Sequence, residues 1–107
     1  MTDKIVILST CESREEAGRI ARHLVERRVA ACVNILEGAR SIYWWQGQVE
    51  EGSEALLVIK SSRDLFDRVR EELLRMHSYQ TPEVIALPVI AGSEAYLEWM
   101  ARELQKP

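Results

Sequence analysis

Residues 30–60 contain two strand-like runs of β-branched and aromatic residues that meet at Gln46 and Gly47. A polar residue followed by glycine is typical of a two-residue hairpin turn, because glycine accepts the positive φ that such turns require. Each run has more than a dozen residues and extends on the order of 40 Å at ~3.3 Å per residue. The pattern therefore predicts a single β-hairpin whose strands are about twice the ordinary length.

This hairpin is too long to be covered by its own domain, whose radius of gyration should be ~13 Å. The overhanging part is residues 41–54, and its apolar and acidic positions are Ile42, Tyr43, Trp44, Trp45, Val49, Glu50, Glu51 and Glu54. Bare strand edges rich in aromatic residues associate, so we expect burial against another copy of the chain. The alternative is a twisted hairpin that wraps over its own core. Gly38 and Gly52 lie roughly opposite each other in this hairpin, which indicates a bulge or bend.

The rest of the chain alternates between strand and helix patterns. Residues 5–8 are a continuous apolar run, typical of a central strand. Ser13 and Glu16 have the spacing of a capping box, and a stripe of apolar residues at helical spacing follows them. A second helix is predicted after the capping residues Ser61 and Ser62. Its apolar face is Phe66, Val69, Leu73 and Met76.

A short strand at residues 84–87, ended by Pro88, and a helix after Ser93 complete the pattern. The last helix has the apolar positions Tyr96, Leu97, Met100, Ala101 and Leu104. It packs either on its own sheet or on a neighbouring subunit. With right-handed crossovers, this order of elements predicts an α+β fold: a ferredoxin-like βαββαβ sandwich with strand order 4-1-3-2, a long central hairpin and an added C-terminal helix.

The composition narrows the range of partners. With 107 residues, 47% of them hydrophobic, the chain is expected to form one globular domain over residues 1–107. Mixed charges with a net charge of −3 provide no basic patch for nucleic acid or an anionic membrane surface. No apolar run reaches the ~18 residues of a membrane span, and residues 1–4 lack a basic and apolar leader, so we expect a cytoplasmic protein.

The predicted topology brings Cys11, His77, Tyr79 and Glu83 to one end of the sheet. A thiolate, an imidazole and a carboxylate suit copper or zinc, and Met76 adds a soft thioether. The competing interpretation is structural, because a cysteine at a strand end is usually part of the core and a histidine at a helix C-terminus complements the helix dipole. The residues alone favour this structural interpretation.

Motifs of catalysis are missing. The sequence has no G-x-S-x-G, no H-E-x-x-H and no glycine-rich phosphate loop after the first strand, so we expect no enzyme. Lys60 is predicted at the opposite end of the sheet from His77 in one subunit. In a closed ring it approaches the site of a neighbour, although an ordinary lysine at a strand end is the simpler interpretation.

Three long segments carry a family resemblance: RRVAACVNI, SIYWWQGQVEEGSEALLVIK and HSYQTPEVIALPVIAGSEAYLEW. In order and spacing they resemble the CutA divalent-cation-tolerance family over nearly the whole chain. The resemblance implies a homotrimer built through the 30–60 hairpin, with an assembly similar to the PII signalling proteins. It also implies copper binding through a cysteine near the end of the first strand and two adjacent histidines. His77 matches the second histidine, Met76 replaces the first, and the cysteine position falls on Cys11 or Ser9.

The first functional hypothesis is therefore a trimeric, cytoplasmic protein that binds copper or another divalent metal ion through Cys11, His77 and Met76 and acts in tolerance of, or response to, metal ions. The alternative is a PII-like sensor or signalling trimer with a small molecule in the clefts between subunits. In that case Lys60, Tyr79 and Glu83 supply the polar contacts.

Overall fold

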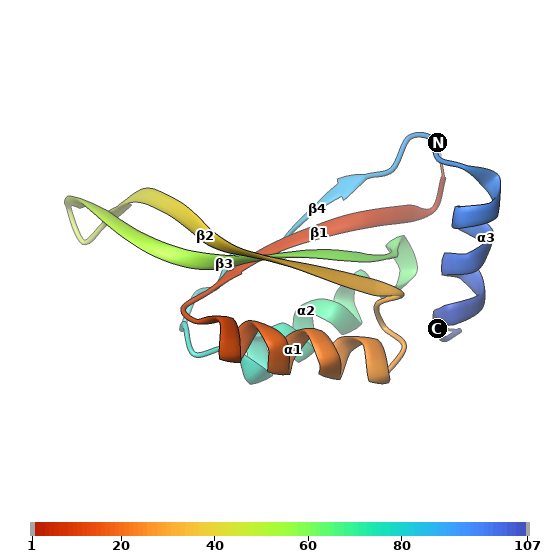
Figure 1. Ribbon diagram of the computed structural model, residues 1–107, viewed down its shortest axis with the longest axis horizontal. Helices are drawn as coiled ribbons and strands as arrows, with labels where there is room; N and C mark the ends of the chain where they lie inside the picture. Colours follow the sequence, from red (N-terminus) through yellow and green to blue (C-terminus); the bar gives the residue numbers. More distant parts are fainter. Residues whose placement is uncertain (1, 107) are drawn as a thin grey trace.

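The computed structural model describes residues 2–106 and contains a four-stranded antiparallel sheet with helices packed around it (Figure 1). The elements are β1 (Lys4–Cys11), α1 (Arg14–Glu26), β2 (Cys32–Trp45), β3 (Gln48–Ser62), the 3-10 helix η1 (Arg63–Leu65), α2 (Phe66–Met76), β4 (Ile85–Pro88) and α3 (Glu94–Glu103). The strand order β2-β3-β1-β4 is the predicted 4-1-3-2 order read from the other edge. The predicted ferredoxin-like α+β fold is confirmed.

The core lies between the sheet and helices α1 and α2, which cover one face of the sheet (Figure 1). Alternate residues of the two central strands point toward these helices, so β1 buries Ile7 and Cys11 and β3 buries Leu57 and Ile59. Facing them are Ile20, Leu24, Val69 and Leu73, which come from the two predicted helical stripes. Burial of one such aliphatic side chain contributes about 1.5–3 kcal/mol.

In the part of the chain that the structure describes, no helix covers the opposite face of the sheet (Figure 1). Val6 pairs with Leu87, and Leu8 pairs with Val58 and Ile85. Directly paired residues share a face, so these apolar side chains form a continuous open face. Ile85 and Leu87 remain 51% and 49% exposed.

The starts of the helices differ in part from the sequence prediction. Ser13 caps α1 as expected, because its Oγ accepts from the Glu16 N–H at 3.1 Å. In a capping box the Glu16 carboxylate would accept from the N–H of Ser13. Here it accepts from the N–H of Glu12, one residue earlier. Ser61 and Ser62 do not cap α2, because they belong to β3 and η1 intervenes before Phe66. Strands β1 and β3 stay paired through Ser62, and this pairing outweighs the preference of Ser61 and Ser62 for capping a helix.

The long hairpin has the predicted turn, with Gln46 at φ 49° and Gly47 at φ 81°. A bulge lies between Leu36 and Ala39 and contains Gly38 at φ 77°. The bulge confirms the expected irregularity, but the expected opposition of the two glycines is wrong, because the pairing runs without a shift from the turn to Ala39 and places Gly52 opposite Ser41.

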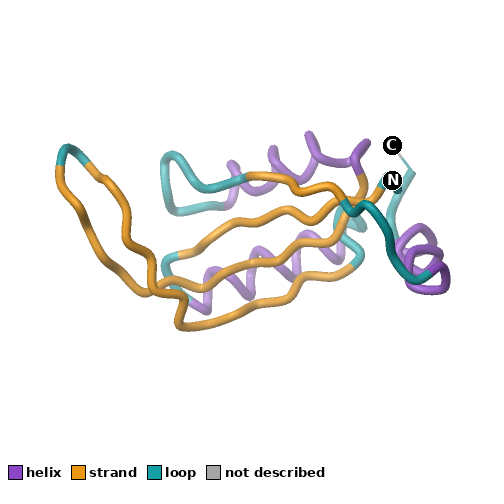
Figure 2. Tube along the Cα trace, turned by 90° about the horizontal axis from the view of Figure 1, so that it is seen from above, coloured by secondary structure: helices purple, strands orange, loops and turns teal. Residues whose placement is uncertain are grey.

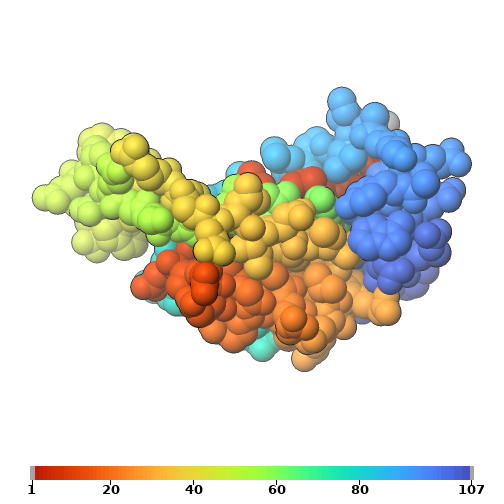
Figure 3. Space-filling model, in the orientation of Figure 1, coloured from red at the N-terminus to blue at the C-terminus, as the bar shows by residue number. Residues whose placement is uncertain are grey.

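The end of the hairpin extends beyond the body of the molecule and does not wrap over the core (Figures 2 and 3). The described chain measures 44 × 25 × 22 Å along its principal axes. Trp44 is 74% exposed and Ile42 is 63% exposed, so the expected overhang is present.

Helix α3 lies at the opposite end of the molecule from the hairpin turn (Figure 2). Met100 and Leu104 pack with Leu65 and Ala31 in a second cluster of buried residues. The sequence allowed this helix to pack on its own fold or on a neighbouring subunit, and packing on its own fold accounts for the burial of Met100 and Leu104. Ala101, which was predicted on the apolar face, is exposed.

Candidate functional site

Cys11 and His77 meet where β1 and α2 end, although 66 positions separate them in the sequence. Cys11 is the last residue of β1, and His77 follows directly after α2, with its N–H bonded to the Leu73 carbonyl at 2.9 Å. The Cys11 Sγ lies 3.9 Å from the His77 Nε2. The fold thus brings together the two ligand-type side chains that the topology placed at this end.

The backbone fixes the imidazole of His77. Nε2 lies 2.8 Å from the carbonyl oxygen of Thr10, and Nδ1 lies 3.1 Å from the N–H of Tyr79. A carbonyl only accepts and a backbone N–H only donates, so the ring is the neutral tautomer with its proton on Nε2. Both ring nitrogens are therefore occupied by backbone partners, as expected for a structural histidine.

Cys11 is fully buried, with none of its surface exposed. Burial is the main cause that raises the pKa of the Cys11 thiol, and together with the nearby carboxylates of Glu16 and Glu54 it brings this pKa to about 12. The thiol is therefore protonated at neutral pH. A metal ion bound to this sulfur must displace the proton.

Ser9 lies on the same buried face of β1, two positions before Cys11. Its Oγ is buried without a hydrogen-bond partner in the described structure. The contact to His77 is made by Cys11. This contact favours Cys11 over Ser9 for a role beside the histidine.

Two carboxylates that sequence reasoning did not assign to the site anchor the residues around His77. Glu16 is 5% exposed, and its carboxylate accepts from the Ser78 N–H at 2.7 Å and from the Glu12 N–H at 3.3 Å. Burial acts to raise the pKa of Glu16, but hydrogen bonds led by Ser78 outweigh it and hold that pKa below its ordinary value. The capping-box spacing marked Glu16 as a helix residue, but only tertiary structure shows its second partner.

Glu54 is the other anchor. The hydroxyl of Tyr79 donates to its carboxylate at 2.7 Å. Burial raises the pKa of Tyr79, and the bond to Glu54 raises it further, so this phenol stays protonated. Nothing local in the sequence links the base of the hairpin to the segment after α2.

The other predicted site residues are Met76, Glu83 and Lys60. Met76 packs against the core cluster that contains Cys11. Glu83 is exposed between α2 and β4. Lys60 is paired with Val6 and Cys32, and its Nζ lies 3.4 Å from the hydroxyl of Tyr96 on α3.

Two consequences follow for the predicted sites. Lys60 lies toward the α3 end of the sheet, whereas Tyr79 contacts the end that carries Cys11, so the three cleft candidates do not form one site in a subunit. Within residues 2–106, no group of three or more histidine, cysteine, aspartate or glutamate residues is arranged to hold a metal ion.

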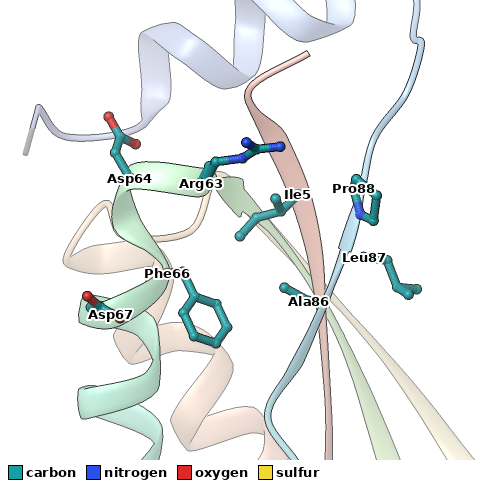
Figure 4. A pocket seen from close by; sticks show the side chains of 8 residues that line it. All are labelled: Ile5, Arg63, Asp64, Phe66, Asp67, Ala86, Leu87 and Pro88. Atoms are coloured by element: carbon teal, nitrogen blue, oxygen red, sulfur yellow. The ribbon is translucent and has the colours of Figure 1, made fainter. Parts of the chain in front are cut away.

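Two cavities flank the sheet at different ends. One of about 220 Å³ adjoins the site and is lined in part by Glu12, Ser13 and Glu54. A larger one, of about 540 Å³, lies between α2 and β4, where Ile5, Phe66 and Ala86 face it (Figure 4). The larger cavity is at the start of β1 and is not lined by Cys11 or His77, so it is not part of the candidate site.

Comparison with known proteins gives consistent matches. The family model of the CutA1 divalent ion tolerance protein matches residues 5–103. The divalent-cation tolerance protein CutA of Thermus thermophilus is 46% identical over 95 residues, which are 89% of this chain and 92% of the relative. The chloroplastic CutA protein of Arabidopsis thaliana is 44% identical over 90% of this chain, which spans 53% of that relative. The solved structure of the periplasmic divalent cation tolerance protein CutA from Archaeoglobus fulgidus has a TM-score of 0.93 and 38% identity, covering 95% of this chain and 99% of that chain.

The antiparallel sheet, its two covering helices and the overhanging hairpin define a ferredoxin-like α+β protein. This chain belongs to the CutA1 family of divalent ion tolerance proteins. Among the described residues, no helix is both long enough and apolar enough to cross a membrane.

Proposed function

We propose that this protein is a homotrimer that binds copper or another divalent metal ion and acts in tolerance of such ions. Family membership supports the role in tolerance. The observation that carries the metal assignment is the 3.9 Å approach of the Cys11 Sγ to the His77 Nε2.

The donor set fits a soft or borderline metal ion. Metal bonds to sulfur and to imidazole nitrogen are about 2.3 and 2.0 Å long, so one ion can bridge atoms that are 3.9 Å apart. Thiolate and imidazole suit copper and zinc, and a thioether from Met76 as a third ligand favours Cu(I). Binding would require that Cys11 lose its proton and that the proton of His77 move from Nε2 to Nδ1, with release of the Thr10 carbonyl and of the Tyr79 N–H. Because the thiol must lose a proton, metal affinity should rise with pH.

The proposed trimer rests on two apolar surfaces. One is the open face of the sheet, where Ile85 and Leu87 are half exposed, and the other is the overhanging hairpin with Trp44. Large apolar surfaces exposed on a single chain mark protein interfaces. Packing three copies around these surfaces covers both, as the family resemblance implies.

The role proposed here is non-catalytic, and the proposed location is the cytoplasm. Cys11 and Cys32 are both free thiols, which suits a reducing compartment. The relatives named as chloroplastic and periplasmic show that location varies within the family. Cell fractionation with an antibody against the native protein tests the assignment.

Calorimetric titration of the reduced protein with Cu(I) under anaerobic conditions tests metal binding. We expect one ion per chain, with binding lost in His77→Ala and in Cys11→Ala. His23→Ala is the matched control, because His23 is in the last turn of α1 and contacts Glu72 of α2 rather than Cys11. Equal binding by the His77→Ala variant and the wild type would contradict the assignment, as would non-stoichiometric uptake by the wild type.

A further inference from the structure

The segment formed by residues 77–79 is attached by polar bonds to three separate elements. Each of its residues donates one of these three bonds, and each acceptor belongs to a different part of the fold. The bonds run from the His77 Nε2 to the Thr10 oxygen of β1 at 2.8 Å, from the Ser78 N–H to Glu16 of α1 at 2.7 Å, and from the Tyr79 hydroxyl to Glu54 of β3 at 2.7 Å.

His77, the first residue of this segment, lies against Cys11, which is otherwise enclosed by the core. The imidazole of His77 lies against the thiol, and Cys11 has no exposed surface. Cys32, the other free cysteine, is partly exposed. A solute therefore reaches Cys11 only when residues 77–79 move or the fold opens.

We propose that Glu16 and Glu54 are positioning residues that hold residues 77–79 closed over Cys11 and thereby control the access of a metal ion to the thiol. The metal part of this inference rests on the proposed function. The closure itself does not, because it follows from the bonds and the burial of this subunit.

One movement uncovers both side chains. When the segment lifts, the His77 Nε2 leaves the Thr10 carbonyl and the Cys11 Sγ becomes accessible at the same time. The imidazole can then act as a ligand once its proton moves from Nε2 to Nδ1. Hydrogen bonds to a carboxylate are stronger than those between neutral groups. Loss of one such bond should raise the open fraction on the order of tenfold.

Alkylation of Cys11 by N-ethylmaleimide, followed by mass spectrometry, measures the open fraction in a Cys32→Ser background. We expect Tyr79→Phe to raise the alkylation rate on the order of tenfold, and Glu16→Gln, which keeps one oxygen able to accept from the Ser78 N–H, to raise it less. Tyr96→Phe removes a hydroxyl at the α3 end, and Glu15→Gln neutralises an exposed neighbour of Glu16, so both controls should react like the parent.

A graded pair of variants separates positioning from general damage. Glu54→Gln keeps an oxygen that accepts from Tyr79, whereas Glu54→Ala removes it. We expect the alkylation rate to rise less in Glu54→Gln than in Glu54→Ala. Equal rates in these two variants, or a Tyr79→Phe rate equal to that of the parent, would overturn the proposal.

Urea distinguishes local opening from unfolding. A local opening exposes little surface, so the alkylation rate should change little over low urea concentrations, whereas global unfolding depends steeply on urea. A steep dependence in Tyr79→Phe would show that this variant reacts through unfolding, and the closure would then be rejected.

Copper transfer tests the second half of the inference. We expect Tyr79→Phe to accept Cu(I) from a coloured bicinchoninate complex faster than the parent, with unchanged stoichiometry. If alkylation responds as expected but the wild type binds no Cu(I), the closure stands and the proposed metal function fails. If the wild type binds Cu(I) and Tyr79→Phe accepts it at the parental rate, the metal function stands and the control of access fails.

Discussion

The hydroxyl of Ser61 donates a 2.6 Å hydrogen bond to the carbonyl oxygen of Val29, which lies 32 positions earlier in the chain. Both residues are fully buried. This bond joins the end of β3 to the connection between α1 and β2. Ser9, which is equally buried, has a hydroxyl with no hydrogen-bond partner among residues 2–106.

These two serines should respond in opposite ways to the same substitution. Ser61→Ala leaves the Val29 carbonyl without its bond from the hydroxyl and should lower the free energy of unfolding by about 1–3 kcal/mol. Ser9→Ala removes an unsatisfied buried hydroxyl and should leave stability unchanged or raise it. Urea denaturation at one protein concentration compares them, and a larger loss in Ser9→Ala than in Ser61→Ala would refute this account of the two hydroxyls.

The glycines of the hairpin should differ in their tolerance of a side chain. Gly47 has φ 81°, which L-residues rarely adopt, so Gly47→Ala should reduce the free energy of unfolding by about 1 kcal/mol. Gly52 has no positive φ, and a Cβ added there would lie 4.0 Å from the Tyr43 hydroxyl, an ordinary contact. Gly52→Ala should therefore change stability by less than about 0.5 kcal/mol. Equal losses in thermal or urea denaturation would count against the role of φ.

The open face of the sheet should control assembly. Leu87→Glu places a charge on this apolar face, and burial of that charge without a partner should dissociate the proposed trimer. Ala101→Glu adds the same charge on the exposed side of α3 and should leave the assembly intact. Light scattering after size exclusion gives the mass directly, and a trimeric mass for Leu87→Glu would exclude this face from the interface.

Glu72 should contribute to the dependence of stability on pH. A hydrogen bond with His23 is the main cause that lowers the pKa of Glu72 below the ordinary 4.5, and Arg75 lowers it further. A carboxyl whose pKa is lower in the folded state stabilises the fold above its unfolded pKa, and this contribution disappears as the pH falls through the folded pKa.

Glu72→Gln should therefore be less stable than the wild type near neutral pH, and the difference should shrink below about pH 4.5 as Glu72 takes up a proton. Asp67→Asn is the control, because its ion pair with Arg70 is largely exposed and should contribute little. Urea denaturation across this pH range provides the measurement. A difference between Glu72→Gln and wild type that grows at acid pH would reverse the assigned sign.

Much of the fold could be predicted from local patterns. Helix α1 was predicted because its apolar stripe repeats every three to four residues, and the hairpin turn because Gln46 and Gly47 accept positive φ. The pairing of Leu36 with Leu56 was not predictable, because the bulge near Gly38 changes the register by an amount that only the paired strands define.

For the candidate site, too, some features were predicted from the sequence and others were shown only by the tertiary structure. Topology was enough to place Cys11 beside His77, since strand and helix directions alone decide which ends meet. The chain's residue types also indicated soft ligands and an overhanging apolar hairpin. Only the tertiary structure showed that both nitrogens of His77 are occupied, that the Cys11 thiol is protonated, and that Glu16 and Glu54 anchor the segment above it. Hydrogen bonds and desolvation act over a few ångströms between residues far apart in sequence, so no local pattern specifies them.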